Sequence, residues 1–211
     1  KKNVSNNSIN FFHKKLKIST VFQEKPLGLG HAILCAKHLI KNDFFGIFLP
    51  DEVLLENNKI IDFKNMMKYL KKNCEGQILV EKVSKKEVSN YGIVQLESPQ
   101  FKSNGLMRIK KILEKPSFTK STNNYRVVGR YILPKDIFSF LEKTKTSSNN
   151  EIELTDAINK MIGDRKLNIN ACLNNSEIYD CGSVKGFVGA NIAFSLLNNE
   201  LRKYVKALIN D

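Results

Sequence analysis

Apolar and polar positions along the chain follow two patterns that alternate. Apolar residues recur at helical spacing around residues 31–41, 63–73, 134–143, 152–162 and 184–198, and again up to Ile209. Between them lie short runs rich in Val, Ile, Leu, Phe and Tyr, at residues 44–49, 77–83, 92–96, 106–113, 126–133, 167–172 and 178–180. These runs are typical of strands. The alternation predicts an α/β protein with helices around a mixed sheet and a more hairpin-like middle third.

Composition narrows the class of protein further. With 211 residues, 42% of them hydrophobic, the chain can fill one core and is simplest as one domain. The longest apolar run, residues 44–49, is far shorter than the roughly 18 residues of a membrane span, and the polar first ten residues lack the apolar core of a signal peptide. Four scattered cysteines without a C-x-x-C pair indicate free thiols. We therefore expect a cytoplasmic protein that does not enter a membrane.

The net charge of +13 raises the question of nucleic-acid binding. The lysines lie in short groups along the chain and far outnumber the arginines, which favours a solvated basic surface. A basic module that binds RNA or DNA remains the alternative from another class.

Candidate site residues follow the predicted strands, where ligands bind in open α/β sheets. Asp51 comes after an apolar strand and Pro50, so it is suited either to a hard cation or to capping a turn. Its neighbour Glu52 is expected to face solvent. Asp180 precedes a helix and is either a second carboxylate near the metal or an N-terminal cap.

Glycines and a charged pair mark the remaining candidates. Gly28 lies ahead of a helix, where a bare backbone can approach a base or phosphate, although an ordinary turn explains it equally well. Gly92 and Gly129 interrupt strand patterns, which indicates either a close ligand or a bulge. Glu114 and Lys115 end a strand and suit a sugar hydroxyl and a phosphate, or form an exposed ion pair.

Taken in order, these stretches resemble bacterial UTP-glucose-1-phosphate uridylyltransferases, which are sugar nucleotidyltransferases. The resemblance covers roughly residues 21–189 and rests on the following set: Gln23, Gly28-Leu29-Gly30-His31-Ala32, Leu49-Pro50-Asp51, Tyr91-Gly92-Ile93-Val94, Glu114-Lys115-Pro116, Val128-Gly129-Arg130-Tyr131, Leu154-Thr155-Asp156-Ala157 and Tyr179-Asp180-Cys181-Gly182.

The resemblance implies a Rossmann-like nucleotidyltransferase fold with a mixed, mostly parallel sheet. It also implies a reaction in which UTP and glucose 1-phosphate give UDP-glucose and pyrophosphate with Mg²⁺ as cofactor. TTP, CTP or ATP in place of UTP is the alternative within the enzyme class. The resemblance implies that Gln23 and Gly28 bind the uracil. Asp51 would bind the metal and act in catalysis, with Asp180 as a candidate second metal ligand. The sugar would be contacted by Gly92, Glu114, Val128 and Gly129, and Lys115, which we count as catalytic, would neutralise the sugar phosphate.

One part of the family pattern has no counterpart in this sequence. In the family, the first strand leads into a glycine-rich loop with an arginine that wraps the triphosphate. Our hypothesis is that residues 1–20 are a connecting segment and residues 21–211 the carboxyl-terminal part of a single nucleotidyltransferase domain, without the N-terminal strand and phosphate loop. Such a chain would have little activity alone, would expose a sheet edge and self-associate, and is compatible with a homo-oligomer. A noncatalytic chain that pairs with an intact homologue is a further alternative.

Overall fold

The computed structural model describes residues 17–55, 62–98, 101, 105–117, 124–164 and 167–210. Most of the predicted connecting segment, residues 1–20, lies outside these ranges, and residues 17–20 contain no helix or strand. None of the described helices combines the length and apolar character that a bilayer crossing requires.

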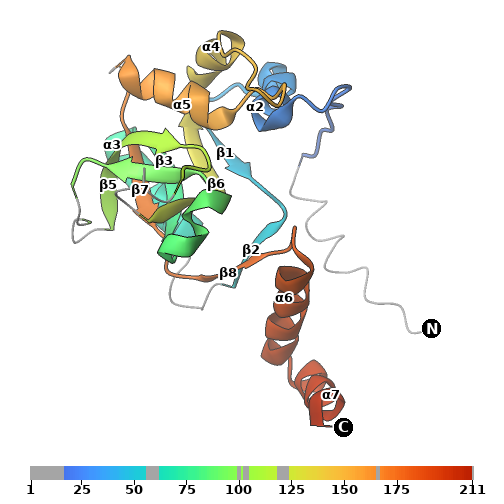
Figure 1. Cartoon of the computed structure of the whole chain (residues 1–211). Helices are drawn as coiled ribbons and strands as arrows, with labels where there is room; N and C mark the ends of the chain where they lie inside the picture. The colour runs from blue at the N-terminus through green and yellow to red at the C-terminus, as the bar shows by residue number, and fades with distance from the viewer. Residues whose placement is uncertain are drawn as a thin grey trace.

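A six-stranded sheet in the order β1-β6-β3-β7-β5-β4 forms the centre of the molecule (Figure 1). Its strands are β1 (Phe44–Phe48), β3 (Gly76–Lys82), β4 (Ile93–Leu96), β5 (Leu106–Leu113), β6 (Tyr125–Pro134) and β7 (Ile169–Leu173). β4 also pairs with the start of β6, so the sheet curls back on itself. Each of these strands corresponds to a predicted run.

The expectation of a mostly parallel sheet needs correction. Among the described strands only β3 and β7 form a parallel ladder. β6 runs antiparallel to β1, β3 and β4, and β5 runs antiparallel to β4 and β7. The reason is the hairpin-like middle third of the sequence, because β4 and β5 form an antiparallel pair and the long β6 lies between β1 and β3.

A second, two-stranded sheet lies below the first in Figure 1. It joins β2 (Glu52–Leu55) to β8 (Glu177–Asp180) in antiparallel register, with Glu52 opposite Asp180. β8 covers the predicted run 178–180, whereas β2 was not predicted. This small sheet brings the segment after β1 next to the segment before α6.

Helices cover both faces of the central sheet. α2 (Gly28–Cys35), the short 3₁₀ helix η1 (Lys37–Leu39), α4 (Ile137–Glu142) and α5 (Leu154–Gly163) lie on one side, and α3 (Asp62–Asn73) lies on the other (Figure 1). A further 3₁₀ helix, η2 (Lys85–Asn90), leads into β4. The predicted helix 31–41 begins earlier, at Gly28, and ends at Cys35.

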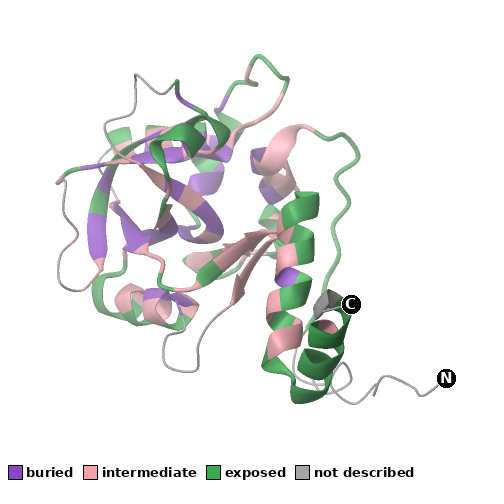
Figure 2. Ribbon diagram, turned by 60° about the horizontal axis from the view of Figure 1, so that its bottom comes forward, coloured by how far each residue is buried: buried purple, intermediate pink, exposed green. Residues whose placement is uncertain are grey.

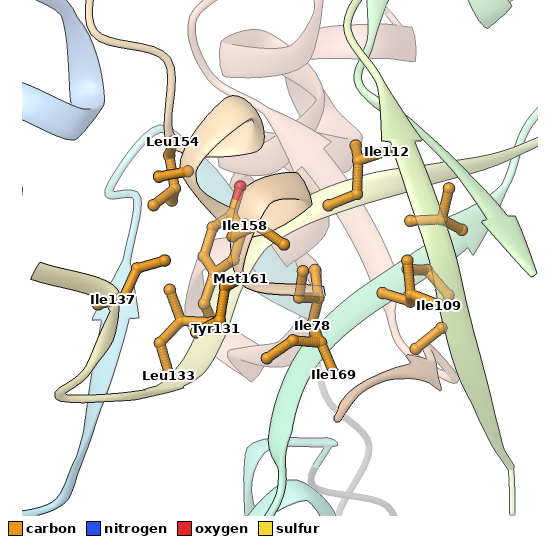
Figure 3. Packing of buried hydrophobic residues seen from close by; sticks show 14 of the residues in the cluster. Ile78, Ile109, Ile112, Tyr131, Leu133, Ile137, Leu154, Ile158, Met161 and Ile169 are labelled. Atoms are coloured by element: carbon orange, nitrogen blue, oxygen red, sulfur yellow. The ribbon is translucent and has the colours of Figure 1, made fainter. Parts of the chain in front are cut away.

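Two apolar clusters fix these layers. On the α5 side, Leu154, Ala157, Ile158 and Met161 recur at helical spacing, and all are buried against the sheet (Figure 3). On the α3 side, the buried residues are Met66, Leu79, Leu106, Val128, Ile132 and Cys172. The sheet therefore has an apolar face on both sides, as expected of an α/β layer structure.

The last two helices, α6 (Val184–Leu197) and α7 (Asn199–Asn210), form a hairpin that projects from the body (Figures 1 and 2). The hydroxyl of Ser183 caps α6 by accepting a hydrogen bond from the amide of Gly186 at 3.0 Å. Ala190 is the one buried residue described in this helix. Large apolar side chains such as Phe187 and Leu197 remain exposed.

Candidate active site

Two carboxylates that are far apart in the sequence meet at the end of β1. Asp51 follows β1 through Leu49 and Pro50, and its carbonyl oxygen accepts a 2.7 Å hydrogen bond from the amide of Cys181. Asp180 is the last residue of β8, and its Oδ1 accepts a 3.0 Å hydrogen bond from the amide of Gly182. A methyl group placed on Gly182 would stand 3.0 Å from Asp180 Oδ1 and 3.6 Å from Asp51 Oδ2. The β2–β8 pairing therefore brings both carboxylates beside Gly182.

These carboxylates lie on the wall of a cavity of about 380 Å³. The predicted residues that line it are Asp51, Gly92, Glu114, Lys115, Gly129 and Asp180. They come from separate loops and strand ends around the sheet, except for Gly129, which lies inside β6. The structure thus collects most of the predicted site in one depression.

The Glu114–Lys115 pair lies where β5 ends. Thr155 Oγ1 donates a 3.2 Å hydrogen bond to Glu114 Oε2, and this oxygen stands 3.4 Å from where a side chain on Gly92 would begin. The backbone of Lys115 has a φ of 39°, and its amide donates to the carbonyl of Tyr91 at 3.1 Å. Both charged side chains are exposed to solvent at the cavity. They can therefore meet a hydroxyl and a phosphate of one ligand.

Gly129 packs against the loop after β1. Its carbonyl oxygen accepts a 2.9 Å hydrogen bond from Leu49, and a methyl group at position 129 would stand 2.6 Å from Leu49 Cβ. Such a separation is a clash. Glycine at this position lets β6 and the Asp51 loop approach each other.

Val128 is placed differently from the prediction. Its side chain is fully buried in the cluster on the α3 side, and the neighbouring Val127 lines the cavity instead. The cause is the alternation of side chains along β6, which sends positions 127 and 129 to the cavity and position 128 to the opposite face.

The predicted base-binding residues lie beside the cavity and do not line it. Gln23 Nε2 donates to the carbonyl of Gly28 at 3.1 Å and lies 3.0 Å from His31 Nδ1. Gly28 begins α2 with a φ of 87°, a conformation that favours glycine. Leu29, the next residue, does line the cavity. The Gln23–Gly28 contact therefore lies next to the cavity, because Leu29, which follows Gly28, forms part of the cavity wall.

Sequence reasoning missed the role of Glu52, which was expected to face solvent. Its side chain is only 12% exposed, and its carboxylate accepts hydrogen bonds from Arg126 Nη1 and from the amide of Gly129. Arg126 Nε also donates to Glu81 Oε2 at 2.8 Å. Arginines at both positions 126 and 130 of an otherwise apolar predicted strand were a sequence signal of buried acceptors, but they did not identify Glu52 as the partner of Arg126.

The cavity is acidic although the chain is strongly basic. Among the described residues that line it, Lys115 is the one cation. Five lining residues carry carboxylates: Asp51, Glu52, Glu114, Glu153 and Asp180. Burial, with the negative charges of Glu114, Glu151 and Asp156, raises the pKa of Glu153. Burial likewise raises the pKa of Tyr131 in the cavity wall. Such a site favours cations.

The carboxylate pair fits a hard divalent metal with incomplete protein coordination. The described residues hold no group of three or more His, Cys, Asp or Glu side chains placed to bind a metal. Two carboxylates on an open cavity leave positions for water and phosphate oxygens, which is how Mg²⁺ is often bound. Asp51 and Asp180 are thus chemically suited to a metal that a phosphorylated ligand helps to hold.

Comparison with known proteins gives one consistent result. Residues 3–195 match the model of a family described as nucleotidyl transferase. The chain is 33% identical over 201 residues to the UTP-glucose-1-phosphate uridylyltransferase of Haemophilus influenzae and 32% identical over 194 residues to that of Haemophilus ducreyi. These matches cover 94% and 90% of this chain and 68% and 65% of the two relatives. The chain thus spans about two thirds of their length.

Solved structures give the same similarity. A UDP-glucose pyrophosphorylase complexed with UDP-glucose superposes with a TM-score of 0.82 at 36% identity, over 90% of this chain and 70% of that one. A UTP-bound enzyme of the same kind from Acinetobacter baumannii gives 0.83 at 31% identity, over 98% and 73%. The predicted resemblance and the nucleotidyltransferase-type α/β fold are confirmed.

Proposed function

The chain belongs to the nucleotidyl transferase family, and from this premise we propose that its cavity takes part in transfer of a uridylyl group from UTP to glucose 1-phosphate. The observation that carries the proposal is the convergence of Asp51 and Asp180 with Glu114 and Lys115 on one cavity. Relatives whose printed names include this activity, and solved structures that hold UTP or UDP-glucose, support it.

The proposed reaction needs no general base. An oxygen of the glucose 1-phosphate phosphate group, already ionised near neutral pH, forms a bond to the α-phosphorus of UTP while the bond to pyrophosphate breaks. Positioning and charge neutralisation then account for catalysis. Lys115 would face the sugar phosphate, Glu114 would accept hydrogen bonds from sugar hydroxyls, and the Gln23–Gly28 pair would hold the uracil.

We propose Mg²⁺ as the metal, held by Asp51 and Asp180. When bound, it would neutralise part of the charge on the phosphates. The four free cysteines accord with a reducing cytoplasm, which we propose as the compartment.

Binding is the sharpest test, because the glycine-rich loop of the family has no counterpart in this sequence. Calorimetric titration of the chain with UDP-glucose in the presence of Mg²⁺ should give saturable one-site binding, and UTP should bind more tightly than TTP, CTP or ATP. Tightest binding of TTP, CTP or ATP would favour another sugar nucleotidyltransferase. Salt-sensitive binding of arbitrary RNA, without binding of UDP-glucose, would favour the nucleic-acid module.

Replacing Asp51 tests the metal assignment. Asp51→Ala should weaken Mg²⁺-dependent binding of UDP-glucose by at least about tenfold, because a charge-assisted metal contact is lost. Asp51 is exposed, so the melting temperature should change little. The matched control is Asp136→Ala, another exposed aspartate, which lies away from the cavity and makes no side-chain cap hydrogen bond. Unchanged Mg²⁺ dependence in Asp51→Ala would remove this residue from the site.

A further inference from the structure

We propose that Glu52 is a positioning residue that locks the cavity wall at Gly129 to the loop that carries Asp51. The proposal concerns the wall that meets the sugar end of the ligand, and it rests on the proposed function. One oxygen of the Glu52 carboxylate accepts from the guanidinium of Arg126, and the other accepts from the backbone amide of Gly129. Both side chains are almost inaccessible, at 12% for Glu52 and 5% for Arg126.

The sheet itself explains why Gly129 needs such a partner. The β3–β6 ladder pairs Ile78 with Tyr131 and Val80 with Val127, and its register shifts between these pairs. Residues 128–130 of β6 therefore face the single residue Leu79, so this stretch of β6 bulges. On its other edge β6 meets β1, because the carbonyl of Gly129 bonds to the amide of Leu49, and the β1 ladder ends at Phe48 opposite Arg130. The amide of Gly129 on that edge therefore has no ladder partner, and an unpaired amide in a shielded position is costly. Glu52 supplies the acceptor.

Arg126 fixes the other side of the Glu52 carboxylate. Its Nε donates to Glu81 Oε2 at 2.8 Å, and its guanidinium carbon lies 4.7 Å from the centre of the Tyr91 ring. The carbonyl of Tyr91 in turn accepts the amide of Lys115 at 3.1 Å. Glu52 thus belongs to a network that reaches from the Asp51 loop to the strand end carrying Lys115.

A second arginine of β6 holds the loop on both sides of Asp51. Arg130 Nη1 donates to the carbonyl of Leu49 at 2.8 Å, and Arg130 Nη2 donates to the carbonyl of Glu52 at 2.7 Å. The backbone before and after Pro50 and Asp51 is therefore tied to β6. In the opposite direction, a side chain that follows the loop bonds to the backbone of β6, because the carboxylate of Glu52 accepts from the amide of Gly129. The metal-binding candidate and the sugar wall then form one rigid unit.

The test compares two ways of removing a carboxylate from Arg126. Glu52→Gln neutralises the carboxylate that accepts hydrogen bonds from both Arg126 and the amide of Gly129. The control Glu81→Gln neutralises the other carboxylate that is bonded to Arg126, and Glu81 makes no bond to Gly129. A third variant, Glu52→Leu with Arg126→Leu, deletes the ion pair, and the carboxylate of Glu81 that then loses Arg126 is 30% exposed and can be hydrated. It therefore separates lost positioning from simple misfolding.

Two readouts decide the proposal. Glu52→Gln and the double leucine variant should weaken binding of UDP-glucose by about tenfold, as expected for a lost charged hydrogen bond, with a smaller effect on UTP. Amide hydrogen exchange should become faster in residues 127–131. Glu81→Gln should leave both readouts near the wild-type values. Equal behaviour of Glu52→Gln and Glu81→Gln, or wild-type exchange in residues 127–131 of the double variant, would overturn the proposal.

The outcomes also separate this proposal from the proposed function. A wild-type chain that binds neither UDP-glucose nor UTP would refute the function. The hydrogen-exchange comparison would still show whether Glu52 holds the wall at Gly129, because it requires no ligand.

Discussion

Glu153 shows how a single residue of the cavity links the acidic site to stability. Burial raises its pKa above the ordinary value of 4.5, and the carboxylates of Glu114, Glu151 and Asp156 raise it further, while Lys115 lowers it. The ionised form is therefore less favourable in the folded chain than in the unfolded chain. The contribution of this group to the free energy of unfolding falls as the pH rises from 4.5 through the raised pKa.

Glu153→Gln removes that penalty. We expect a higher melting temperature than wild type at neutral pH and a much smaller difference below pH 4.5, where the carboxyl group is protonated in both states. Thermal melts followed by circular dichroism over this pH range measure the effect. A variant with a lower melting temperature than wild type at neutral pH, or with the same difference in melting temperature at both ends of the pH range, would contradict the raised pKa of Glu153.

Gly129 offers a test of close packing between β6 and the Asp51 loop. Gly129→Ala should destabilise the chain by about 1–3 kcal/mol, because the added methyl group meets Leu49 in a region with little room to adjust. The matched control is Gly163→Ala at the end of α5, where no atom lies within 4 Å of the added group. That change should be neutral or stabilising by up to about 1 kcal/mol. Urea denaturation of both variants gives the two values, and equal effects would argue against the clash.

The residues that sequence reasoning found and missed differ in how local their signals are. Asp51 and Glu114 follow predicted strand runs and Asp180 ends one, so their position at strand ends could be predicted directly. Glu52 is adjacent to Asp51, but its partner Arg126 is 74 positions away. No periodicity specifies such a pairing. Val128 was misplaced because a motif gives residue identity, whereas the face of β6 is decided by the strand register and its bulge.

At the scale of elements, a buried carboxylate joins α3 to the turn between β7 and β8. Asp62 is 1% exposed, and it accepts from Ser176 Oγ at 2.6 Å and from the amide of Asn175 at 3.3 Å. It also lies in the first turn of α3, where the helix dipole favours a negative charge. One side chain thus anchors a helix and a turn that lie far apart in the sequence.

Asp62→Ala should lower the free energy of unfolding by about 3 kcal/mol, because several buried donors lose their acceptor together. The control is Asp136→Ala, the exposed aspartate before α4 that makes no side-chain cap hydrogen bond. It should change stability by less than about 1 kcal/mol. Chemical denaturation of the two variants provides the comparison. A small effect of Asp62→Ala would mean that α3 is held by its apolar face alone.

The order and type of the elements were predictable, while some pairings were not. The six central strands and the helices α3 to α7 carry clear apolar patterns. β2 has only four residues and becomes a strand through pairing with β8, more than a hundred positions later. That long-range pairing also brings Asp51 to Asp180. The parts of the site that escaped prediction therefore depend on contacts that only the folded chain creates.

On the scale of the whole molecule, apolar surface is distributed unevenly. The core of the central sheet is closed on both faces, whereas much of the last two helices is exposed (Figure 2). In α6, Val184 is exposed by 83%, Leu197 by 63% and Phe187 by 57%. A helix that is apolar around its circumference is normally covered. Among the described strands, β1 pairs with β6 alone and lies at an edge of the sheet. Unpaired strand edges and apolar patches both promote association.

We predict that the chain self-associates as its concentration rises, measured by size-exclusion chromatography with light scattering. Two variants separate the causes. Phe187→Lys with Leu197→Lys places charge on α6, and Ile47→Lys places charge on the edge strand β1, where lysine is a common protection against pairing. Ile47 is half-buried, so its variant must first show a wild-type circular dichroism spectrum. If the helix hairpin drives association, the α6 variant should be the more monomeric one. The reverse order would identify the β1 edge. A wild-type chain that stays monomeric throughout would contradict both causes.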